Sequence, residues 1–249
     1  LSFGLQNSVV ILLIDSGNSS TKICLSGPEG FGPVRRISLG EKFELSKEEA
    51  MAKNCIYSTV RNNDLTISDE LKRNGILSIS MNPGLSLPFT SEYGSPETFG
   101  NDRKALLAGA TASFPGKNCI LVSMGTCITY DIINREAHHL GGRIAPGMRM
   151  RFEALNNYTD KLPLLEPSKP IESFGTSTEG SIKSGVQMGI ISEINEAIRL
   201  ARKELGSLKV LLTGGDAKFF DNSLKYEIFA DPKLLFKGLH KIYTLNAPS

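Results

Sequence analysis

One short pattern occurs twice in the sequence, and the two copies lie 108 residues apart. An apolar run at residues 9–15 leads into Asp-Ser-Gly-Asn at residues 15–18, and a second run at residues 118–123 leads into Ser-Met-Gly-Thr at residues 123–126. In both halves of the chain, strand-like and helix-like segments then follow in the same order. The pattern predicts a duplicated α/β unit, with the two glycine turns facing each other across a cleft.

Hydrophobic periodicity predicts the elements of each half. Strands are expected at residues 9–15, 21–26, 34–39, 55–60 and 76–81 of the first half, and helices at 46–52, 65–73 and 102–114. Strands are expected at residues 118–123, 127–133, 138–144, 208–213 and 226–230 of the second half, and helices at 148–156, 179–205 and 232–243. In the helix at 179–205, isoleucine or valine recurs at every fourth position from Ile182, and Thr176-x-x-Glu179 predicts a capping box at its start.

Charge and length exclude several classes of protein. The chain has 249 residues, with 28 Lys and Arg against 26 Asp and Glu, which argues against a nucleic-acid binder that relies on bulk positive charge. Its longest apolar run, residues 9–14, is too short for a membrane span. Four cysteines without a Cys-x-x-Cys pair favour buried thiols in a reducing cytoplasm. Residues 1–8, which lack an initiator Met, are expected to be a processed or added extension.

The first glycine turn has the composition of a phosphate site. Gly17 would let two backbone N–H groups approach a phosphate, and Asn18 and Ser19 would add side-chain donors. Asp15, at the end of the preceding strand, is a candidate for Mg²⁺, which prefers oxygen ligands. The alternative is an ordinary β-hairpin turn. The second copy favours the phosphate site, because two such turns can hold a polyphosphate from both sides.

Two further segments suggest chemistry. Gly214-Gly215, after a predicted strand, would let adenosine lie against bare backbone, although a simple strand-to-helix connection has the same composition. Asp102 and Arg103 stand at a predicted helix start after Gly100, where Asp102 is a candidate general base and Arg103 a candidate clamp for an anion. The alternative is that Asn101 and Asp102 only cap that helix.

Taken together, the motifs resemble those of type III pantothenate kinases over residues 10–245, nearly the whole chain. The order and spacing of the segments carry this resemblance more than any single one. They are Asp15-Ser-Gly-Asn-Ser, Tyr93 with Pro96-Glu97-x-x-Gly100-x-Asp102-Arg103, Gly125-Thr126-Cys-Ile-Thr129-Tyr-Asp131, Gly141-Gly142-Arg-Ile-Ala-Pro146-Gly147, Thr159 with Leu162-Pro163, Gly175-Thr-Ser-Thr178, and Thr213-Gly-Gly-Asp216.

The resemblance implies the fold of the acetate and sugar kinase, Hsc70 and actin superfamily. Two ribonuclease-H-like domains, at residues 9–116 and 117–249, would each consist of a mixed five-stranded sheet flanked by helices, with the nucleotide in the cleft between them. The implied activity is ATP-dependent phosphorylation of pantothenate, the first step of coenzyme A biosynthesis.

The resemblance also implies roles for individual residues. Asp102 would accept the proton of the pantothenate hydroxyl. The residues implied to bind ATP or its phosphates are Asp15, Gly17, Asn18, Ser19, Lys22, Gly125, Thr126, Gly214 and Gly215. The residues implied to bind pantothenate are Tyr93, Gly100, Arg103, Thr159 and Thr178. Asp15 would hold Mg²⁺, and Asp131 is the candidate ligand for a monovalent cation, K⁺ or NH₄⁺. The resemblance further implies a cytoplasmic homodimer, with no nucleic-acid or membrane partner.

One departure from the family pattern bears on function. Ser123 stands where the family has an acid, and a serine supplies no carboxylate to a metal or its water. Two alternatives follow: a weak or inactive family member with a regulatory role, or a kinase or phosphohydrolase of the same superfamily that acts on another substrate. Arg143, Arg149 and Arg151 form either a local basic patch or a solvated face.

The remaining candidates favour structural roles. His138 and His139 are adjacent on a predicted strand and would point to opposite faces, so they would not bind one metal together. Gly185 and Gly189 lie four residues apart on the long helix, where small residues suit close packing of a helix or a subunit.

Overall fold

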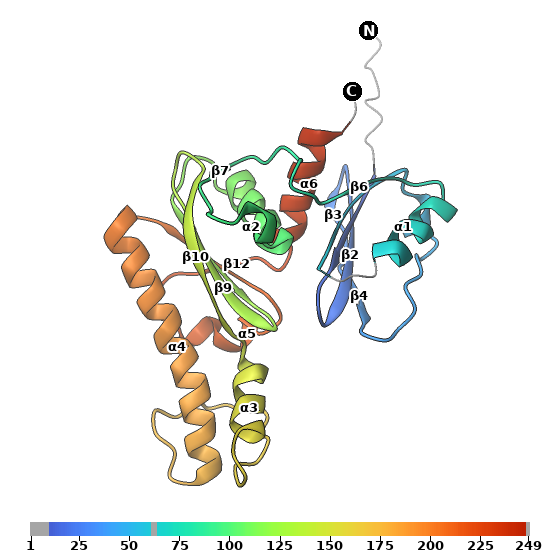
Figure 1. Ribbon diagram of the computed structural model, residues 1–249. Coiled ribbons are helices and arrows are strands. Elements are labelled where there is room, and N and C mark those ends of the chain that lie inside the picture. The colour runs from blue at the N-terminus through green and yellow to red at the C-terminus, as the bar shows by residue number, and fades with distance from the viewer. Residues whose placement is uncertain (1–9, 61–63, 248–249) are drawn as a thin grey trace. The chain divides into compact units, whose positions relative to one another are not determined.

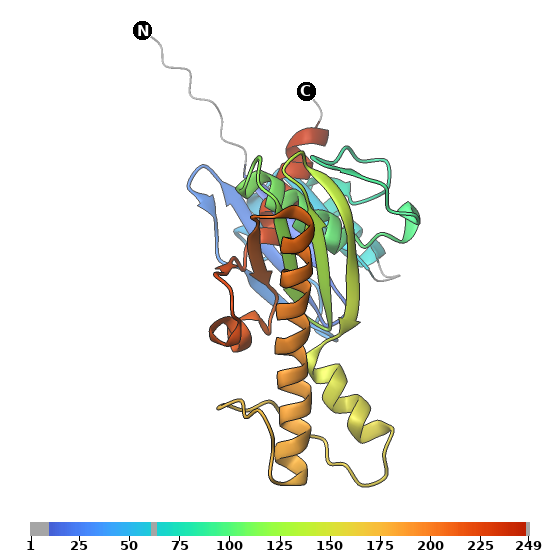
Figure 2. The same cartoon turned by 90° about the vertical axis from the view of Figure 1, so that its left-hand side faces the viewer.

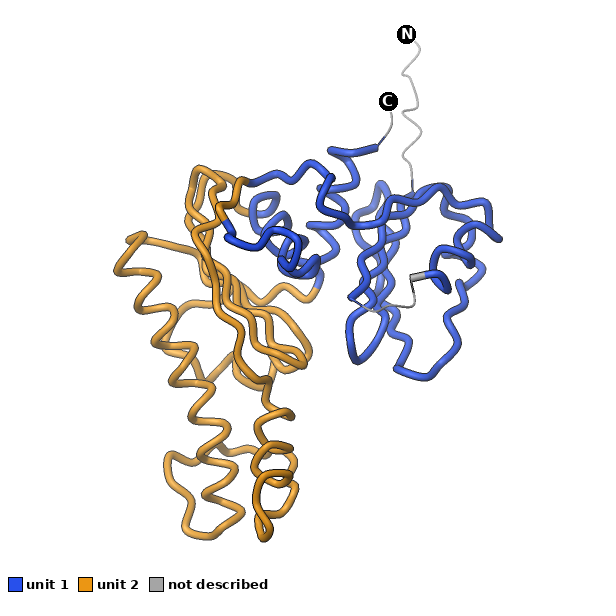
Figure 3. Tube along the Cα trace, viewed as in Figure 1, with its two compact units in different colours: residues 1–89, 93–113, 233–249 blue, residues 90–92, 114–232 orange. Residues whose placement is uncertain are grey.

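The computed structural model describes residues 10–60 and 64–247 of the chain. The expected extension at residues 1–8 lies outside this part. The chain divides into two compact units (Figure 3), of which unit 1 comprises residues 1–89, 93–113 and 233–249, and unit 2 comprises residues 90–92 and 114–232. The units change over near the predicted boundary at residues 116 and 117. They differ from the predicted domains in the C-terminal segment, which belongs to unit 1.

The sheet of unit 1 has six strands within the described residues, and it begins with an antiparallel hairpin (Figure 1). The hairpin joins β1 (Ile11–Ser16) to β2 (Ser20–Gly27), and β5 (Asn54–Thr59) and β6 (Leu77–Ser80) extend the sheet in parallel from β1. On the other side, β2 pairs with β3 (Gly30–Phe31) and β4 (Arg35–Ser38). The resulting order is β3-β2-β1-β5-β6.

The sheet of unit 2 repeats this arrangement. Its hairpin joins β8 (Cys119–Met124) to β9 (Cys127–Ile133), and β11 (Lys209–Thr213) and β12 (Phe229–Ala230) extend it in parallel from β8. β10 (His138–Pro146) and β7 (Thr90–Ser91) complete the order β12-β11-β8-β9-β10-β7. β8 begins 108 residues after β1, so the predicted duplication is confirmed in the strand order.

Two glycines let the helices of unit 1 approach each other closely. α2 (Asn101–Ser113) packs against α6 (Leu234–Asn246), and α6 also contacts β1 and β5. A methyl group on Gly109 would overlap the Leu234 carbonyl oxygen, and one on Gly238 would overlap the Ala105 carbonyl oxygen. The remaining helical segments of unit 1 are η1 (Glu49–Met51), α1 (Asp64–Arg73) and η2 (Pro96–Thr98).

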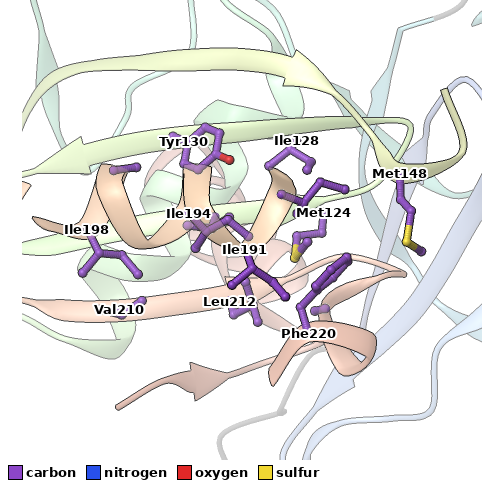
Figure 4. Close-up of a cluster of buried hydrophobic side chains, with 14 of the residues drawn as sticks. Met124, Ile128, Tyr130, Met148, Ile191, Ile194, Ile198, Val210, Leu212 and Phe220 are labelled. Carbon is purple, nitrogen blue, oxygen red and sulfur yellow. The ribbon is translucent and has the colours of Figure 1, made fainter. Parts of the chain in front are cut away.

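A long helix covers the sheet of unit 2 (Figure 2). The isoleucine stripe of α4 (Thr178–Leu205) packs with Ile128, Val210 and Leu212 of the sheet in one buried cluster (Figure 4). α4 extends past the sheet at its N-terminal end, where α3 (Met148–Asn157) packs beside it. The short helices α5 (Ala217–Phe220) and η3 (Asp221–Ser223) follow β11.

Several predicted details are wrong. The cap of α4 is Ser177, whose Oγ accepts a hydrogen bond from the Gly180 N–H at 3.1 Å, so the capping box predicted at Thr176 is displaced by one residue. The helix predicted at 46–52 is only η1, and the strand predicted at 226–230 shortens to β12. β3, β7 and α5 were not predicted, because elements of two to four residues are too short for periodicity to indicate.

The predicted close packing of Gly185 within the chain is also wrong. Within residues 10–60 and 64–247, no atom outside the adjoining backbone of α4 lies within 4 Å of the position that a Gly185 methyl group would occupy, and at Gly189 the nearest such atom is Arg151 Nη1 at 4.0 Å. Among the described helices, none combines the length and the hydrophobicity of a membrane span.

Candidate active site

In unit 1, the site is built around a buried carboxylate at the end of β1. Asp15 is 5% exposed, and its Oδ2 lies 3.7 Å from the Lys22 ammonium on the paired strand β2. Burial raises the pKa of Asp15 to about 6, Lys22 lowers it, and the negative charge of Asp102 raises it. Asp15 and Asp102, the two carboxylates predicted from the sequence to take part in the reaction, are therefore close enough to interact electrostatically.

A second polar group accompanies Asp15 on the neighbouring strand. Ser58 of β5 is in register with Asp15, so both side chains point to the same face of the sheet. Ser58 is 1% exposed, and its Oγ has no hydrogen-bond partner among the described residues. A buried hydroxyl beside a carboxylate suits a hydrated cation, because it can bond to a metal-bound water. Within residues 10–60 and 64–247, no group of three or more His, Cys, Asp or Glu could hold a metal ion alone.

The turn after Asp15 has the geometry of a hairpin. The Gly17 N–H donates to the Ser20 carbonyl at 3.1 Å, which closes the connection between β1 and β2. The hairpin alternative is thus correct as a description of the backbone. The phosphate role of Gly17, Asn18 and Ser19 stays a prediction.

In unit 2, three glycines meet at the end of β8. A methyl group on Gly147 would overlap the carbonyl oxygens of Gly125 and Thr126, and the Gly147 N–H donates to the Thr126 carbonyl at 3.0 Å. Gly214, with a φ of 98°, lies so close to Met124 that a methyl group would overlap the Met124 carbonyl oxygen. The two predicted nucleotide segments of this half are therefore neighbours in the structure.

The same region leaves backbone uncovered. Among the described residues other than its two chain neighbours, no atom lies within 4 Å of the position that a Gly215 methyl group would occupy. Gly215 therefore presents open backbone beside the tightly packed Gly214, as expected where a flat ligand lies against the chain. Gly147 was not among the predicted site residues, although it is the last residue of the segment Gly141-Gly142-Arg-Ile-Ala-Pro146-Gly147 that resembles the family pattern.

Asp102 lies in the first turn of α2. Its Oδ1 accepts a hydrogen bond from the Arg103 N–H at 2.9 Å, so it satisfies one amide of the helix start. The Asn101 side chain instead donates to the Met81 carbonyl at 3.3 Å, so the predicted cap at Asn101 is wrong. A methyl group on Gly100 would be only 2.5 Å from Asp102 Oδ1, so the Asp102 carboxylate would have to turn away from its present position to admit it.

Beside Asp102, two aromatic rings and two cations form what we call the aromatic cluster, namely Tyr93, Phe99, Arg103 and Lys104. Tyr93 stacks on Phe99 with ring centroids 4.6 Å apart. The Arg103 guanidinium lies over both rings, at 5.1 and 4.8 Å from their centroids, and bonds to the Tyr93 hydroxyl at 3.2 Å. The structure thus brings together Tyr93, Gly100 and Arg103, three of the five predicted pantothenate residues.

The other two predicted pantothenate residues belong to unit 2. Thr159, two residues after the end of α3, donates from Oγ1 to the Leu155 carbonyl at 2.7 Å. Thr178, the first residue of α4, lines a cavity of 760 Å³ between α3 and α4. The cavity is otherwise bounded mainly by apolar side chains such as Leu155, Leu162 and Val186.

Asp131 lies in a buried chain of hydrogen bonds. Its Oδ1 is 3.0 Å from His139 Nε2, and His139 Nδ1 is 2.8 Å from the Ser91 hydroxyl on β7. Asp131 and His139 are each 2% exposed. His138, the next residue along β10, bonds instead to Thr90 at 2.8 Å. The predicted structural role of the two histidines is therefore confirmed: they attach β7 to the sheet.

Two of the three arginines considered as a basic patch or a solvated face, Arg149 and Arg151, have acidic partners. Arg149 pairs with Glu153 at 2.8 Å, and Arg151 pairs with Glu193 at 2.6 Å. Glu193 also accepts a hydrogen bond from the Tyr130 hydroxyl at 2.9 Å. The contacts of Glu193 with Arg151 and Tyr130 link α3, α4 and β9, so these charged side chains help to hold the elements of unit 2 together.

Comparison with known proteins gives consistent names. Residues 11–200 match the family model for type III pantothenate kinases. A type III pantothenate kinase of Flavobacterium johnsoniae is 37% identical over 247 residues, covering 94% of this chain and 97% of the relative. One from Christiangramia forsetii is 38% identical, covering 83% and 85%.

Solved structures agree on the fold. A Baf family transcriptional activator from Campylobacter jejuni is 25% identical with a TM-score of 0.64, covering 94% of this chain and 98% of that one. The activator of 2-hydroxyisocaproyl-CoA dehydratase from Clostridium difficile, with bound ADPNP, has a TM-score of 0.53 at 12% identity, covering 95% and 96%. The predicted fold class, duplicated ribonuclease-H-like domains, is confirmed, but the predicted five strands per sheet are wrong: each sheet has six strands within the described residues, because short strands such as β3 and β7 add to the predicted ones.

Proposed function

The chain belongs to the type III pantothenate kinase family, and from this premise we propose that it transfers the γ-phosphoryl group of ATP to the primary hydroxyl of pantothenate. The product, 4′-phosphopantothenate, is the first intermediate of coenzyme A biosynthesis. The observation that carries the proposal is the pair of interacting carboxylates, Asp15 and Asp102, on a fold that fits this family.

Asp102 is proposed as the general base. Its carboxylate would accept the hydroxyl proton while the hydroxyl oxygen attacks the γ-phosphorus and the bond to the bridging oxygen of ADP breaks. Gly100 supports this role, because the absence of a side chain there leaves room for the Asp102 carboxylate at the helix start. Tyr93 and Arg103 are proposed to hold pantothenate from the same helix end.

The glycine segments are proposed to bind the nucleotide. Gly17, Asn18, Ser19 and Lys22 of unit 1 would contact phosphate. Gly125, Thr126, Gly214 and Gly215 of unit 2 would offer backbone to the phosphates and to adenosine. Their support is the meeting of Gly125, Gly147 and Gly214 at one strand end and the open face of Gly215.

Mg²⁺ fits the residues of unit 1. Asp15 offers one carboxylate, Ser58 offers a buried hydroxyl without a partner among the described residues, and Mg²⁺ commonly completes its shell with phosphates and water. When bound, Mg²⁺ would neutralise charge on the β- and γ-phosphates. Asp15, with a pKa of about 6, is ionised at neutral pH and available for this role.

A monovalent cation, K⁺ or NH₄⁺, remains part of the proposal without an assigned ligand set. Asp131 is a poor fit, because one of its oxygens already bonds to His139 in a fully buried pair. Phosphorylation rates in K⁺, NH₄⁺ and Na⁺ salts of equal ionic strength test the requirement.

A cytoplasmic homodimer is also proposed. Exposed apolar side chains follow α3 in unit 2, where Tyr158 is 88%, Leu164 55% and Phe174 90% exposed. Covering them in a dimer would be favourable. Light scattering during gel filtration tests the dimer, and the four free cysteines are consistent with a reducing compartment.

The activity is tested by coupling ADP release to pantothenate addition. We expect Asp102→Asn to lower kcat by about 10²- to 10⁴-fold, because a general base contributes an effect of that size, while ATP binding is retained. Full activity in this variant would overturn the role of Asp102. Asp69→Asn, at an exposed acid on α1, is the matched control and should leave kcat unchanged.

A panel of other acceptors separates the alternatives. Turnover with another alcohol but not with pantothenate would favour a different kinase of this fold. No ADP release with any acceptor, with Mg²⁺ and K⁺ or NH₄⁺ present, would favour a regulatory protein.

A further inference from the structure

Ser58 is a buried hydroxyl whose capacity for hydrogen bonding the described residues leave unused. It is 1% exposed, and its Oγ has no hydrogen-bond partner within residues 10–60 and 64–247. The Oγ of Ser26 is the one other buried side-chain oxygen or nitrogen of these residues without a partner. Because burying a hydroxyl without a hydrogen bond costs free energy, such a group calls for an explanation, and a bound ion or water is one.

Strand register places Ser58 in a row of three polar side chains. Asp15 is paired with Lys22 on β2 and with Ser58 on β5, so the three side chains lie on one face of the sheet. Asp15 is the middle residue of this row, and its Oδ2 lies 3.7 Å from the Lys22 ammonium. Asp15 therefore has a cation on one side and, on the other side, a hydroxyl without a partner among the described residues.

The face that carries this row belongs to the side of the sheet where α2 and α6 pack. The preceding residues, Ile14 and Tyr57, point to the opposite face, where they share a buried cluster with residues of α1. α6 contacts β1 and β5, and α2 contacts β5. Asp102, at the start of α2, is near enough to raise the pKa of Asp15. Ser58 thus lies on the side of the sheet that holds both candidate carboxylates.

This arrangement fits one water molecule of a hydrated cation. An ionised carboxylate only accepts hydrogen bonds, whereas a metal-bound water has two protons to donate. One proton can go to Asp15 and the other to Ser58 Oγ, because neighbouring strands lie only about 4.8 Å apart. A phosphate oxygen is disfavoured at the same place, since it would lie beside the negative charge of Asp15. Mg²⁺ suits the place, because it commonly keeps several of its waters when it binds to a protein.

We propose that Ser58 and Asp15 together bind a water of the Mg²⁺ shell, so that this site holds the cation through its water and not through direct protein ligands. The inference rests on the proposed function, since it deepens the Mg²⁺ site proposed there. Ser58 is a positioning residue in this scheme, because it orients a water of the cation and contacts neither ATP nor the acceptor. The place beside Ser58 is also on the side of Asp15 away from Lys22, where the ammonium repels a cation least.

The test measures how much Mg²⁺ tightens the binding of ADP. Calorimetry gives Kd for ADP in Mg²⁺ and in EDTA, and the ratio of the two constants is the contribution of the cation. We expect Ser58→Ala to reduce this ratio about 3- to 10-fold, the usual effect of losing one hydrogen bond, and to leave Kd in EDTA within about twofold of the native value.

The chain offers a matched control for this variant. Ser26 is also buried, has no hydrogen-bond partner among the described residues and lies on the same face of the sheet. It is paired with Ile11, at the other end of β1 from Asp15. Ser26→Ala should therefore leave both dissociation constants unchanged.

A second probe distinguishes a hydrated cation from a directly bound one. Hexamminecobalt(III) resembles hydrated Mg²⁺ in shape, donates hydrogen bonds from its ammonia ligands and does not release them. We expect it to tighten the binding of ADP to the native protein, and Ser58→Ala to reduce this effect by a factor similar to that for Mg²⁺. If Mg²⁺ tightens the binding of ADP and hexamminecobalt(III) does not, the cation is bound directly and the proposal is overturned.

A further variant separates the hydroxyl from the packing of its side chain. Ser58→Cys keeps a side chain of similar size but replaces the oxygen with sulfur, a weak hydrogen-bond acceptor, so it should lose as much of the Mg²⁺ effect as Ser58→Ala. A native Mg²⁺ effect in either variant would overturn the proposal, as would a native protein whose Kd for ADP is the same in Mg²⁺ and in EDTA.

These measurements are independent of turnover. If the native protein binds ADP more tightly in Mg²⁺ but does not phosphorylate pantothenate, the proposed function fails, and the ADP ratios still decide the role of Ser58. A native protein that binds no ADP in either solution would overturn both proposals.

Discussion

At the scale of single residues, the candidate site contains a buried charge, the Asp15 carboxylate, that destabilises the folded protein. Asp15 is 5% exposed, and its pKa of about 6 lies well above the ordinary value of 3.8, chiefly because burial disfavours the charged form. Lys22 at 3.7 Å offsets only part of that cost. The folded chain therefore holds a carboxylate where an uncharged group would be more stable.

Replacing Asp15 should stabilise the protein while it abolishes Mg²⁺-dependent turnover. The shift from 3.8 to about 6 already includes the attraction of Lys22, and it is worth about 3 kcal/mol at full ionisation. We expect Asp15→Asn to raise the free energy of unfolding by about 1–3 kcal/mol at neutral pH. Urea denaturation of the Mg²⁺-free protein measures this.

The sign of the pH dependence follows from the raised pKa. Because the folded state binds this proton more tightly than the unfolded state, the penalty is absent below about pH 4 and complete above about pH 7. The advantage of Asp15→Asn should therefore shrink as the pH is lowered through this window. A gain of equal size at about pH 4 and pH 7.5 would contradict the explanation.

At the scale of elements, close packing depends on where a glycine stands. Gly238 of α6 faces the Ala105 carbonyl oxygen of α2 without room for a methyl group. Gly185 is also inside a helix, but in the described part of the chain no atom outside the adjoining helix backbone lies within 4 Å of the corresponding position. The same residue type thus has opposite roles in α6 and in α4.

The two glycines should respond in opposite ways to the same substitution. Gly238→Ala should lower the free energy of unfolding by about 2 kcal/mol or more, because backbone has to move to admit the methyl group. Gly185→Ala should raise it by up to about 1 kcal/mol, because alanine is the better helix former. Equal losses in thermal unfolding of the two variants would refute this reading of the helix contacts.

The sequence allowed most elements to be predicted, because their periodicity extends over several residues. The stripe of isoleucines from Ile182 indicated α4, and the apolar runs indicated β1 and β8. β7 has two residues, and its place depends on the contacts of Thr90 and Ser91 with two histidines far along the chain. A contact between residues so far apart in the sequence cannot be predicted from a local sequence pattern. The N-cap of α4 was predicted one residue too early, at Thr176 and not at Ser177. Both residue types are common N-caps, and only the backbone geometry shows which of the two caps the helix.

The candidate site was predictable to a similar extent. The sequence motifs predicted Asp15, Asp102 and the glycine turns as site residues, since those residues stand at the ends of predicted strands and helices. Ser58 was missed because a serine in a strand gives no signal until the register with Asp15 is known.

At the scale of the whole molecule, the chain repeats one strand order in two units and completes the first unit with its last helix. α6 contacts α2, β1 and β5, all of unit 1, although more than a hundred residues of unit 2 intervene in the sequence. The apolar face of α6 includes Leu234, Phe236, Leu239 and Ile242, each at most 1% exposed.

Removing α6 should therefore damage unit 1. We expect a chain that ends at Pro232 to lose cooperative unfolding of unit 1 and to aggregate, because the truncation exposes the buried faces of α2, β1 and β5. A chain that ends at Ala247 is the control and should unfold like the full protein. Hydrogen exchange resolved by segment measures both, and native protection of β1 and β5 in the shorter chain would contradict the expectation.

Because α6 belongs to unit 1, this unit can be completed during protein synthesis only after unit 2 has been made. A chain made from its N-terminus has all of unit 2 available while the last helix of unit 1 is still missing. Until α6 emerges from the ribosome, the apolar surface of β1, β5 and α2 that it covers in the folded protein stays exposed. The risk that the nascent chain aggregates through this surface therefore increases with the time that synthesis of the remaining residues takes. Pauses in translation late in the message would prolong this exposure, whereas pauses early in the message would not.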